Sequence, residues 1–151
     1  MKVLWAVLCA IFCLAGCDLF DLEEVPIQPR DESGRLAPDE PGLLNRFGTA
    51  VAVSQQMLAV GTPGFDIPVQ EGEAALTGAG AVLIFQRSGN GFVQQQVVFS
   101  PTPKAGDAFG ASVSLNGDIL VVGSPGEDGD GDQAGAVYVF TLENGQYVPL
   151  E

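Results

Sequence analysis

Residues 106–140 read GDAFGASVSLNGDILVVGSPGEDGDGDQAGAVYVF and contain three short motifs that indicate the fold. In order they are Phe-Gly at 109–110, Gly-Ser-Pro at 123–125 and Gly-Ala-Val at 135–137. A looser copy of the same series occurs earlier, as Phe-Gly at 47–48, Gly-Thr-Pro at 61–63 and Gly-Ala-Val at 80–82. The chain therefore carries two copies of one unit.

The spacing between the copies places their difference in a single loop. The Phe-Gly and proline positions of the two copies are both 62 residues apart, whereas Phe85 and Phe140 are 55 residues apart. The difference of seven residues falls after the proline of each unit. Length changes confined to one loop are typical of stacked structural repeats.

The pattern around the motifs predicts an all-β fold in which each unit forms four strands. In the second unit, apolar runs at 111–115 and 118–123 flank Asn116-Gly117, a hairpin signal because both residues tolerate positive φ. A third strand at 136–141 and a fourth from Tyr147 follow. The matching strands of the first unit are 48–53, 58–61, 81–86 and 92–99. We therefore expect two four-stranded antiparallel meander sheets.

The motif residues have structural roles that follow from their chemistry. The two phenylalanines are expected to fill the gap between neighbouring sheets, and the glycine after each lets backbones approach closely. Each proline ends the second strand of its unit, because it lacks the N–H that a central strand needs. The residues concerned are Phe47, Gly48, Gly61, Pro63, Phe109, Gly110, Gly123 and Pro125.

The three motifs in this order resemble the FG-GAP repeat of integrin α-chain heads and of many bacterial surface proteins. The resemblance covers residues 45–151 and departs at Thr62 and Ser124, where the family usually has alanine. It implies that each unit is one blade of a β-propeller, with residues 46–99 as the first blade and 100–151 as the second. Propellers contain roughly four to eight blades, so we expect an incomplete propeller whose second blade is truncated in its last strand.

The first 17 residues predict an export signal. Lys2 precedes an apolar run at 3–14 that is too short to span a bilayer comfortably. The run leads into Leu-Ala-Gly-Cys at 14–17, which resembles the lipobox of bacterial lipoproteins and implies that Cys17 becomes the lipid-carrying N-terminus. The alternatives are an ordinary signal peptide with a chance cysteine and an N-terminal anchor helix. Residues 18–45, with four prolines and eight acidic residues, predict a disordered tether.

Composition excludes several classes of function. With 6 basic and 19 acidic residues, the net charge is −13, which argues against binding nucleic acid. The chain has no histidine, so it lacks histidine-based acid–base catalysis and histidine metal sites. It also has no nucleophile elbow or phosphate loop. We therefore expect a protein that is not an enzyme.

The acidic loop after Pro125 is the one candidate metal site. Asp128, Asp130 and Asp132 alternate with glycines, which would let three carboxylates converge on calcium. In integrins, however, the acidic loop lies between the Phe-Gly and Gly-Ala-Pro motifs, whereas here it follows the proline. A soluble turn rich in glycine and aspartate remains the alternative, so calcium is a candidate cofactor.

These features predict a lipid-anchored protein of the bacterial cell envelope that binds a protein or a glycan, as adhesion modules do. The membrane would be a partner through the lipid on Cys17. The alternatives are a truncated structural remnant and an accessory fragment of a larger exported FG-GAP protein or enzyme. Because two blades leave apolar flanks open, we also expect association with itself or with further blades.

Overall fold

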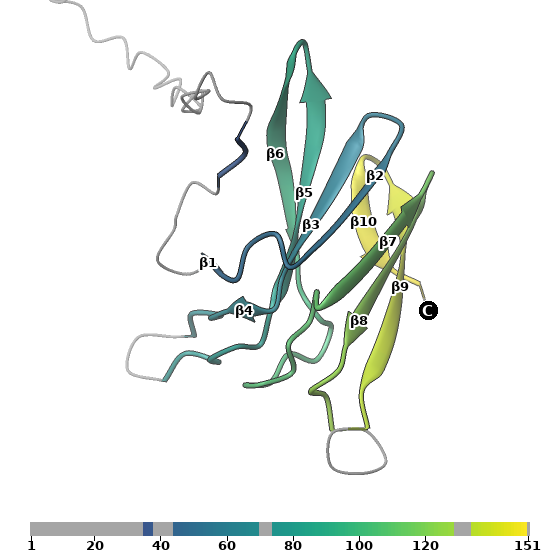
Figure 1. The fold of residues 1–151 in the computed structure, drawn as a ribbon. Helices are drawn as coiled ribbons and strands as arrows, with labels where there is room; N and C mark the ends of the chain where they lie inside the picture. Colours follow the sequence, from purple (N-terminus) through teal and green to yellow (C-terminus); the bar gives the residue numbers. More distant parts are fainter. Residues whose placement is uncertain (1–34, 38–43, 70–73, 129–133, 151) are drawn as a thin grey trace, which may run out of the picture.

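The computed structural model describes residues 35–37, 44–69, 74–128 and 134–150. The strands in these residues form two four-stranded sheets and one two-stranded sheet, and no helix occurs among them (Figure 1). It follows that this part of the chain contains no helix that could cross a membrane. The predicted signal, Cys17 and most of the predicted tether lie outside the described residues.

Both four-stranded sheets are antiparallel meanders. The first sheet contains β2 (Ala50–Ser54), β3 (Met57–Thr62), β5 (Ala81–Ser88) and β6 (Gly91–Val98), in that order. The second sheet contains β7 (Ser112–Asn116), β8 (Ile119–Ser124), β9 (Ala136–Glu143) and β10 (Gln146–Pro149). The predicted all-β fold with two four-stranded meanders is therefore confirmed.

Two details differ from the sequence-based expectation. Asn116 pairs with Ile119 at the end of β7, so the turn consists of Gly117 and Asp118, one residue later than expected. Gly117 has a φ of 57°, which is the backbone conformation that the hairpin requires there. The sequence also gave no sign of the two-stranded sheet, in which β1 (Leu44–Asn45) pairs with β4 (Gly64–Phe65) at the base of the first unit.

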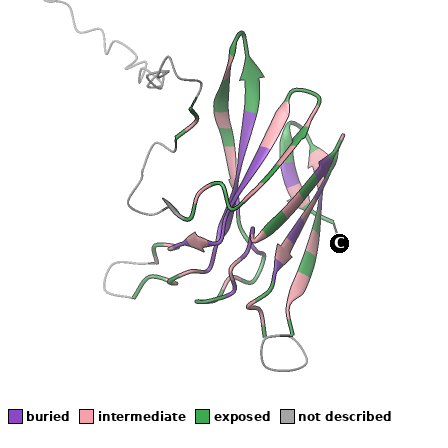
Figure 2. Cartoon of the chain, viewed as in Figure 1, coloured by how far each residue is buried: buried purple, intermediate pink, exposed green. Residues whose placement is uncertain are grey.

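The two large sheets pack face to face, and the main core lies between them. Figure 2 shows buried residues along the central strands of both sheets. This interface buries Ala59, Val82, Ile84 and Val98 from the first sheet against Leu115, Leu120, Val122, Phe140 and Tyr147 from the second, with Phe109 among them. We call the face of the first sheet that carries Val82 and Ile84 its front face. The front face of the second sheet is the one that carries their counterparts, Val137 and Val139. The opposite face of each sheet is its back face.

A second, smaller cluster covers the back face of the first sheet. Val60, Leu83 and Phe85 form its buried centre, and Leu36 and Phe47 pack against them, together with Leu58 and Val97. The first sheet is therefore covered on its front face by the second sheet and on part of its back face by residues that precede β2.

Candidate functional site

The Phe109-Gly110 turn joins the two units. The Phe109 side chain is fully buried, and its ring centroid lies 6.0 Å from that of Phe140 and 5.8 Å from that of Tyr138. The Phe109 and Phe140 rings meet edge to face at 79°, an arrangement that favours aromatic pairs. Phe109 thus fills the space between the two sheets.

Backbone hydrogen bonds attach this turn to the first unit. The Phe109 N–H donates to the carbonyl of Ala79 at 3.0 Å, and the Ala108 N–H donates to the carbonyl of Gly78 at 3.0 Å. A parallel β-bridge pairs Phe109 with Gly80. The second unit is therefore docked on the first by its backbone as well as by side-chain packing.

Glycines make this close approach of backbones possible. A Cβ at Gly61 would overlap the carbonyl oxygen of Gly110, and a Cβ at Gly80 would overlap the backbone of Phe109. Gly110 itself has a φ of 88°, which side-chain-bearing residues rarely adopt. The Gly61 and Gly80 positions form the floor of a docking site for a Phe-Gly turn.

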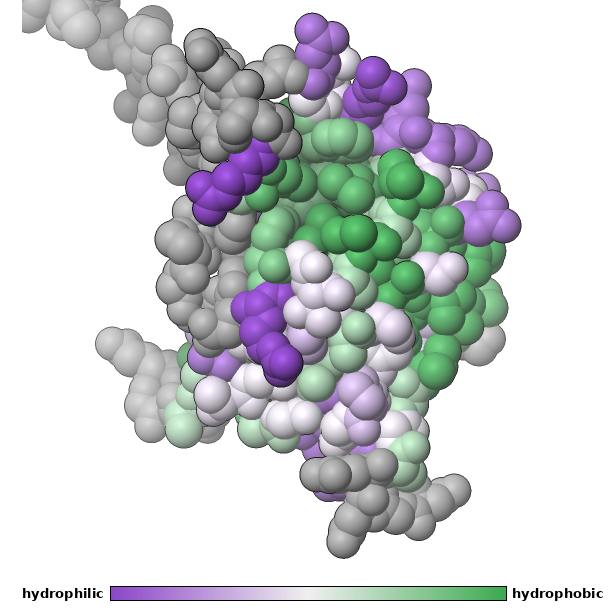
Figure 3. Space-filling model, in the orientation of Figure 1, coloured by the Kyte–Doolittle hydropathy of each residue, from purple (hydrophilic) through white to green (hydrophobic). Residues whose placement is uncertain are grey.

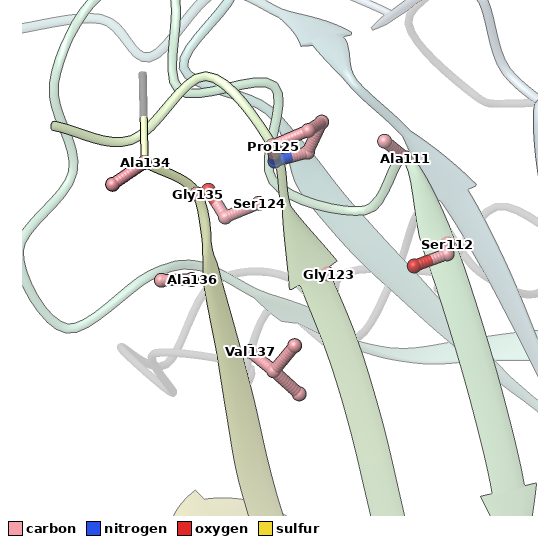
Figure 4. A pocket seen from close by; sticks show the side chains of 9 residues that line it. All are labelled: Ala111, Ser112, Gly123, Ser124, Pro125, Ala134, Gly135, Ala136 and Val137. Atoms are coloured by element: carbon pink, nitrogen blue, oxygen red, sulfur yellow. The ribbon is translucent and has the colours of Figure 1, made fainter. Parts of the chain in front are cut away.

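The second unit has the same docking site, and it is open in the described part of the chain. A shallow groove of about 570 Å³ lies between the neighbouring ends of β7, β8 and β9. Figure 4 shows the side chains that line it. Gly123 and Gly135 stand in this groove where Gly61 and Gly80 stand in the first unit. Its lining residues are Ala111, Ser112, Gly123, Ser124, Pro125, Ala134, Gly135, Ala136 and Val137.

The Phe47-Gly48 turn has the same local geometry as the Phe109-Gly110 turn. The Gly48 N–H donates to Gly61 at 3.2 Å, and the equivalent Gly110 N–H donates to Gly123 at 3.1 Å. The Phe47 ring meets Phe85 edge to face at 6.3 Å and 79°. Phe47 is half-buried on the back face of the first sheet, so the expectation that it fills a gap between two sheets is wrong for the described residues. The reason is that no second sheet lies on that side of it there.

The remaining motif residues lie at strand ends. β3 ends at Thr62 and β8 ends at Ser124, each directly before a proline. Thr62 and Ser124, the two departures from the family pattern, are both fully buried. The Ser124 hydroxyl donates to the carbonyl of Asp107 at 3.0 Å, which ties the end of β8 to the segment before the Phe109-Gly110 turn.

The predicted calcium loop is described only at its edges. Asp128 is exposed, and Asp130 and Asp132 lie outside the described residues. No group of three or more Cys, His, Asp or Glu residues suited to a metal occurs in the part of the chain that is described. Glu127 accepts hydrogen bonds from the Tyr138 hydroxyl at 2.7 and 2.8 Å, one at each carboxylate oxygen. These contacts of Glu127 hold the start of the loop against β9. Calcium binding by the loop stays a prediction.

Sequence reasoning missed the polar contacts between the two units. The Gln96 side-chain amide donates to the Tyr147 carbonyl at 2.9 Å and accepts from the Tyr147 N–H at 2.8 Å. The Ser54 hydroxyl accepts from the Gly117 N–H at 2.9 Å. Neither Gln96 nor Ser54 belongs to a motif, so no signal in the sequence distinguishes them from other polar residues of strands.

Comparison with known families agrees with this geometry. Residues 92–140 match the sequence model of the FG-GAP repeat family. The match begins in β6 and ends in β9, so it includes the Phe109-Gly110 turn and the first three strands of the second sheet. A comparison with curated protein sequences gives no match. Residues 92–140 are thus similar to an FG-GAP repeat, a repeat that is β-propeller-like, and they lie in a chain whose described residues form two four-stranded antiparallel sheets.

Proposed function

We propose that this protein is a non-enzymatic, lipid-anchored binding module of the bacterial cell envelope, which contacts a protein or a glycan through the loops at one end of its sheets. The observation that carries the proposal is a repeated framework with unequal loops. In both units the connection between the second and third main strands emerges at the same end of the molecule (Figure 1), and the two connections differ by seven residues. Variable loops on a constant scaffold are typical of binding proteins.

The described parts of these loops are fixed at their bases. In the first unit, an Asp66 carboxylate oxygen accepts from the Gly78 N–H at 2.7 Å, and Ile67 and Leu76 form an antiparallel bridge. In the second unit, the Gly135 N–H donates to the Glu127 carbonyl at 2.9 Å. Loops held in this way lose less conformational entropy when they bind a partner.

The charge of the chain restricts the partner. A net charge of −13 repels polyanions such as nucleic acids, and it favours partners that are neutral or carry basic patches. A neutral glycan or a protein with a basic surface satisfies this condition. Calcium held by Asp128, Asp130 and Asp132 would reduce the local negative charge and could be coordinated by glycan hydroxyls.

The lipid anchor rests on the Leu-Ala-Gly-Cys sequence at 14–17 behind an apolar run. Two or more acyl chains on Cys17 would hold the module stably at a membrane, and residues 18–45 would separate it from the lipid surface. Expression in a lipoprotein-processing bacterium, followed by mass spectrometry of the mature protein, tests this part. We expect a chain that begins at an acylated Cys17; a chain that retains residues 1–16 and an unmodified Cys17 would exclude it.

The binding role is tested by exchanging one loop. The chain carrying Cys17→Ser is applied to a glycan array and to envelope extracts, beside a variant in which residues 128–134 are replaced by a Gly-Ser segment of equal length. The control is Glu143→Ala, which removes one negative charge from an exposed position at the opposite end of the second sheet. We expect a specific ligand that the loop variant loses and the control keeps. Absence of any ligand, or equal binding by all three proteins, contradicts the proposal.

A further inference from the structure

The interface between the two sheets has two halves. One half has an exposed counterpart elsewhere on the chain, and the other has a counterpart that is exposed in part. The first half is the front face of the first sheet, where Val82 and Ile84 are 0% and 1% exposed because the second sheet covers them. Their counterparts on the front face of the second sheet are Val137 and Val139, which are 69% and 36% exposed. The same kind of apolar surface is thus buried on one sheet and open on the other.

The second half is the back face of the second sheet. There Leu115 and Tyr147 are 8% and 2% exposed because they pack against the first sheet. The 62-residue offset and the pairing of the last two strands make Val53 and Phe92 their counterparts on the back face of the first sheet. Val53 is 67% exposed and Phe92 is 37% exposed. Figure 3 shows a continuous hydrophobic area on the side of the molecule where β2 and β7 to β9 lie.

The turn and the groove show the same complementarity. In the first unit the groove over Gly61 and Gly80 holds the Phe109-Gly110 turn. Among the described residues, nothing fills the equivalent groove of the second unit, and no atom lies within 4 Å of the position of a Cβ at Gly48 of the other Phe-Gly turn. Gly48 has a φ of 85° and Gly110 a φ of 88°, so the two turns present nearly the same backbone.

We propose that copies of this protein bind one another head to tail, with the Phe47-Gly48 turn of one copy in the groove over Gly123 and Gly135 of the next. Val51 and Val53 of the first copy then pack toward Val137 and Val139 of the second. The Phe-Gly turn over two glycines in this contact repeats an arrangement that already exists within the chain, whereas the centre of the back face differs because Leu36 packs on it. This inference goes beyond the proposed binding function and does not depend on it.

Such an interface joins two different surfaces, so it either closes a ring or extends a filament. Propellers close with roughly four to eight blades. Since the described residues of each copy contribute two four-stranded sheets, a closed ring of such copies would contain roughly two to four of them. Leu36 already packs against the centre of the back face, but Val51, Val53 and Phe92 stay exposed beside it and remain available to a neighbour.

The test uses the complete chain carrying Cys17→Ser, so that lipid does not cause association, and sedimentation velocity over a wide concentration range. Val53→Asp disables the head surface, which consists of the Phe47-Gly48 turn with Val51 and Val53. Val137→Asp disables the tail surface, which consists of the groove over Gly123 and Gly135 with Val137 and Val139. Both side chains are more than half exposed, so neither substitution removes buried packing. Gln56→Asp, in the exposed turn between β2 and β3, is the control for added charge.

We expect the parent and Gln56→Asp to form discrete or extended multiples of 15.7 kDa, and each aspartate variant alone to be a monomer, with association weakened about a hundredfold or more. A mixture of the two variants keeps one intact head and one intact tail, so we expect it to form a one-to-one dimer. If an aspartate variant does not melt cooperatively, Val53→Ser or Val137→Ser replaces it. We expect the serine variants to weaken association in the same way but by a smaller factor. A monomeric parent, association unaffected by either substitution, or a mixture that stays monomeric would each overturn the proposal.

Discussion

Replacing Phe109 by alanine removes the side chain that fills the space between the two sheets. Phe109 is fully buried and contacts the rings of Tyr138 and Phe140. Truncation of a buried phenylalanine costs about 3–5 kcal/mol, and aromatic pairs account for about 0.5–1.5 kcal/mol each within that cost. Domains of this kind are stable by about 5–15 kcal/mol, so Phe109→Ala should remove about a fifth or more of the free energy of unfolding.

The same substitution 62 residues earlier is the matched control. Phe47 has the same motif and the same edge-to-face contact with a phenylalanine, but it is only half-buried, and no second sheet covers it in the part of the chain that the structure describes. We expect Phe47→Ala to cost about 1–2 kcal/mol, since less of the side chain leaves water. Urea denaturation of both variants at low protein concentration gives the two values. Equal losses, or a larger loss for Phe47→Ala, would refute the assignment of Phe109 to the interface.

Three further outcomes follow from the structure. Gly61→Ala should cost about 2 kcal/mol or more in calorimetric unfolding, because its Cβ would overlap a backbone carbonyl, whereas Gly123→Ala meets only the rotatable hydroxyl of Ser112 and should cost less. Burial, and then the charge of Asp118, raises the pKa of Tyr147 above its ordinary value of 10.0, so this residue contributes stability below about pH 10 that is lost as pH rises through the folded-state pKa. Tyr147→Phe should remove that alkaline loss in denaturation measured on both sides of pH 10. If the acidic loop holds calcium, titration calorimetry should show weak binding that Asp130→Ala abolishes; no binding by the parent, or unchanged binding by the variant, means that the loop is a turn.

The framework of the fold was predictable because its signals are local and occur twice. The Phe-Gly, Gly-Ser-Pro and Gly-Ala-Val motifs fix strand ends and order, and both four-stranded meanders follow from them. The shift of the hairpin turn to Gly117 and Asp118 reflects the pairing of Asn116 with Ile119, which depends on which side chains face the core.

The candidate docking site was not predictable in full, because it depends on which neighbours are present. Sequence treats Phe47 and Phe109 as equivalent, yet only Phe109 lies between two sheets. The need for glycine at Gly61 arises from Gly110, a residue 49 positions later, and appears only when the two backbones are placed together. The contact between Gln96 and Tyr147 joins residues 51 positions apart and belongs to no motif.

The two units stack through the Phe109-Gly110 turn, and the backbone hydrogen bond from the Phe109 N–H to the Ala79 carbonyl joins them there. Solution NMR can detect this bond as a scalar coupling between the Phe109 nitrogen and the Ala79 carbonyl carbon. We predict that the coupling is present and that the Phe109 amide proton exchanges slowly with solvent. Absence of this coupling together with rapid exchange at Phe109, in a sample that shows the couplings within the β7–β8 hairpin, would mean that the two units do not stack through this turn.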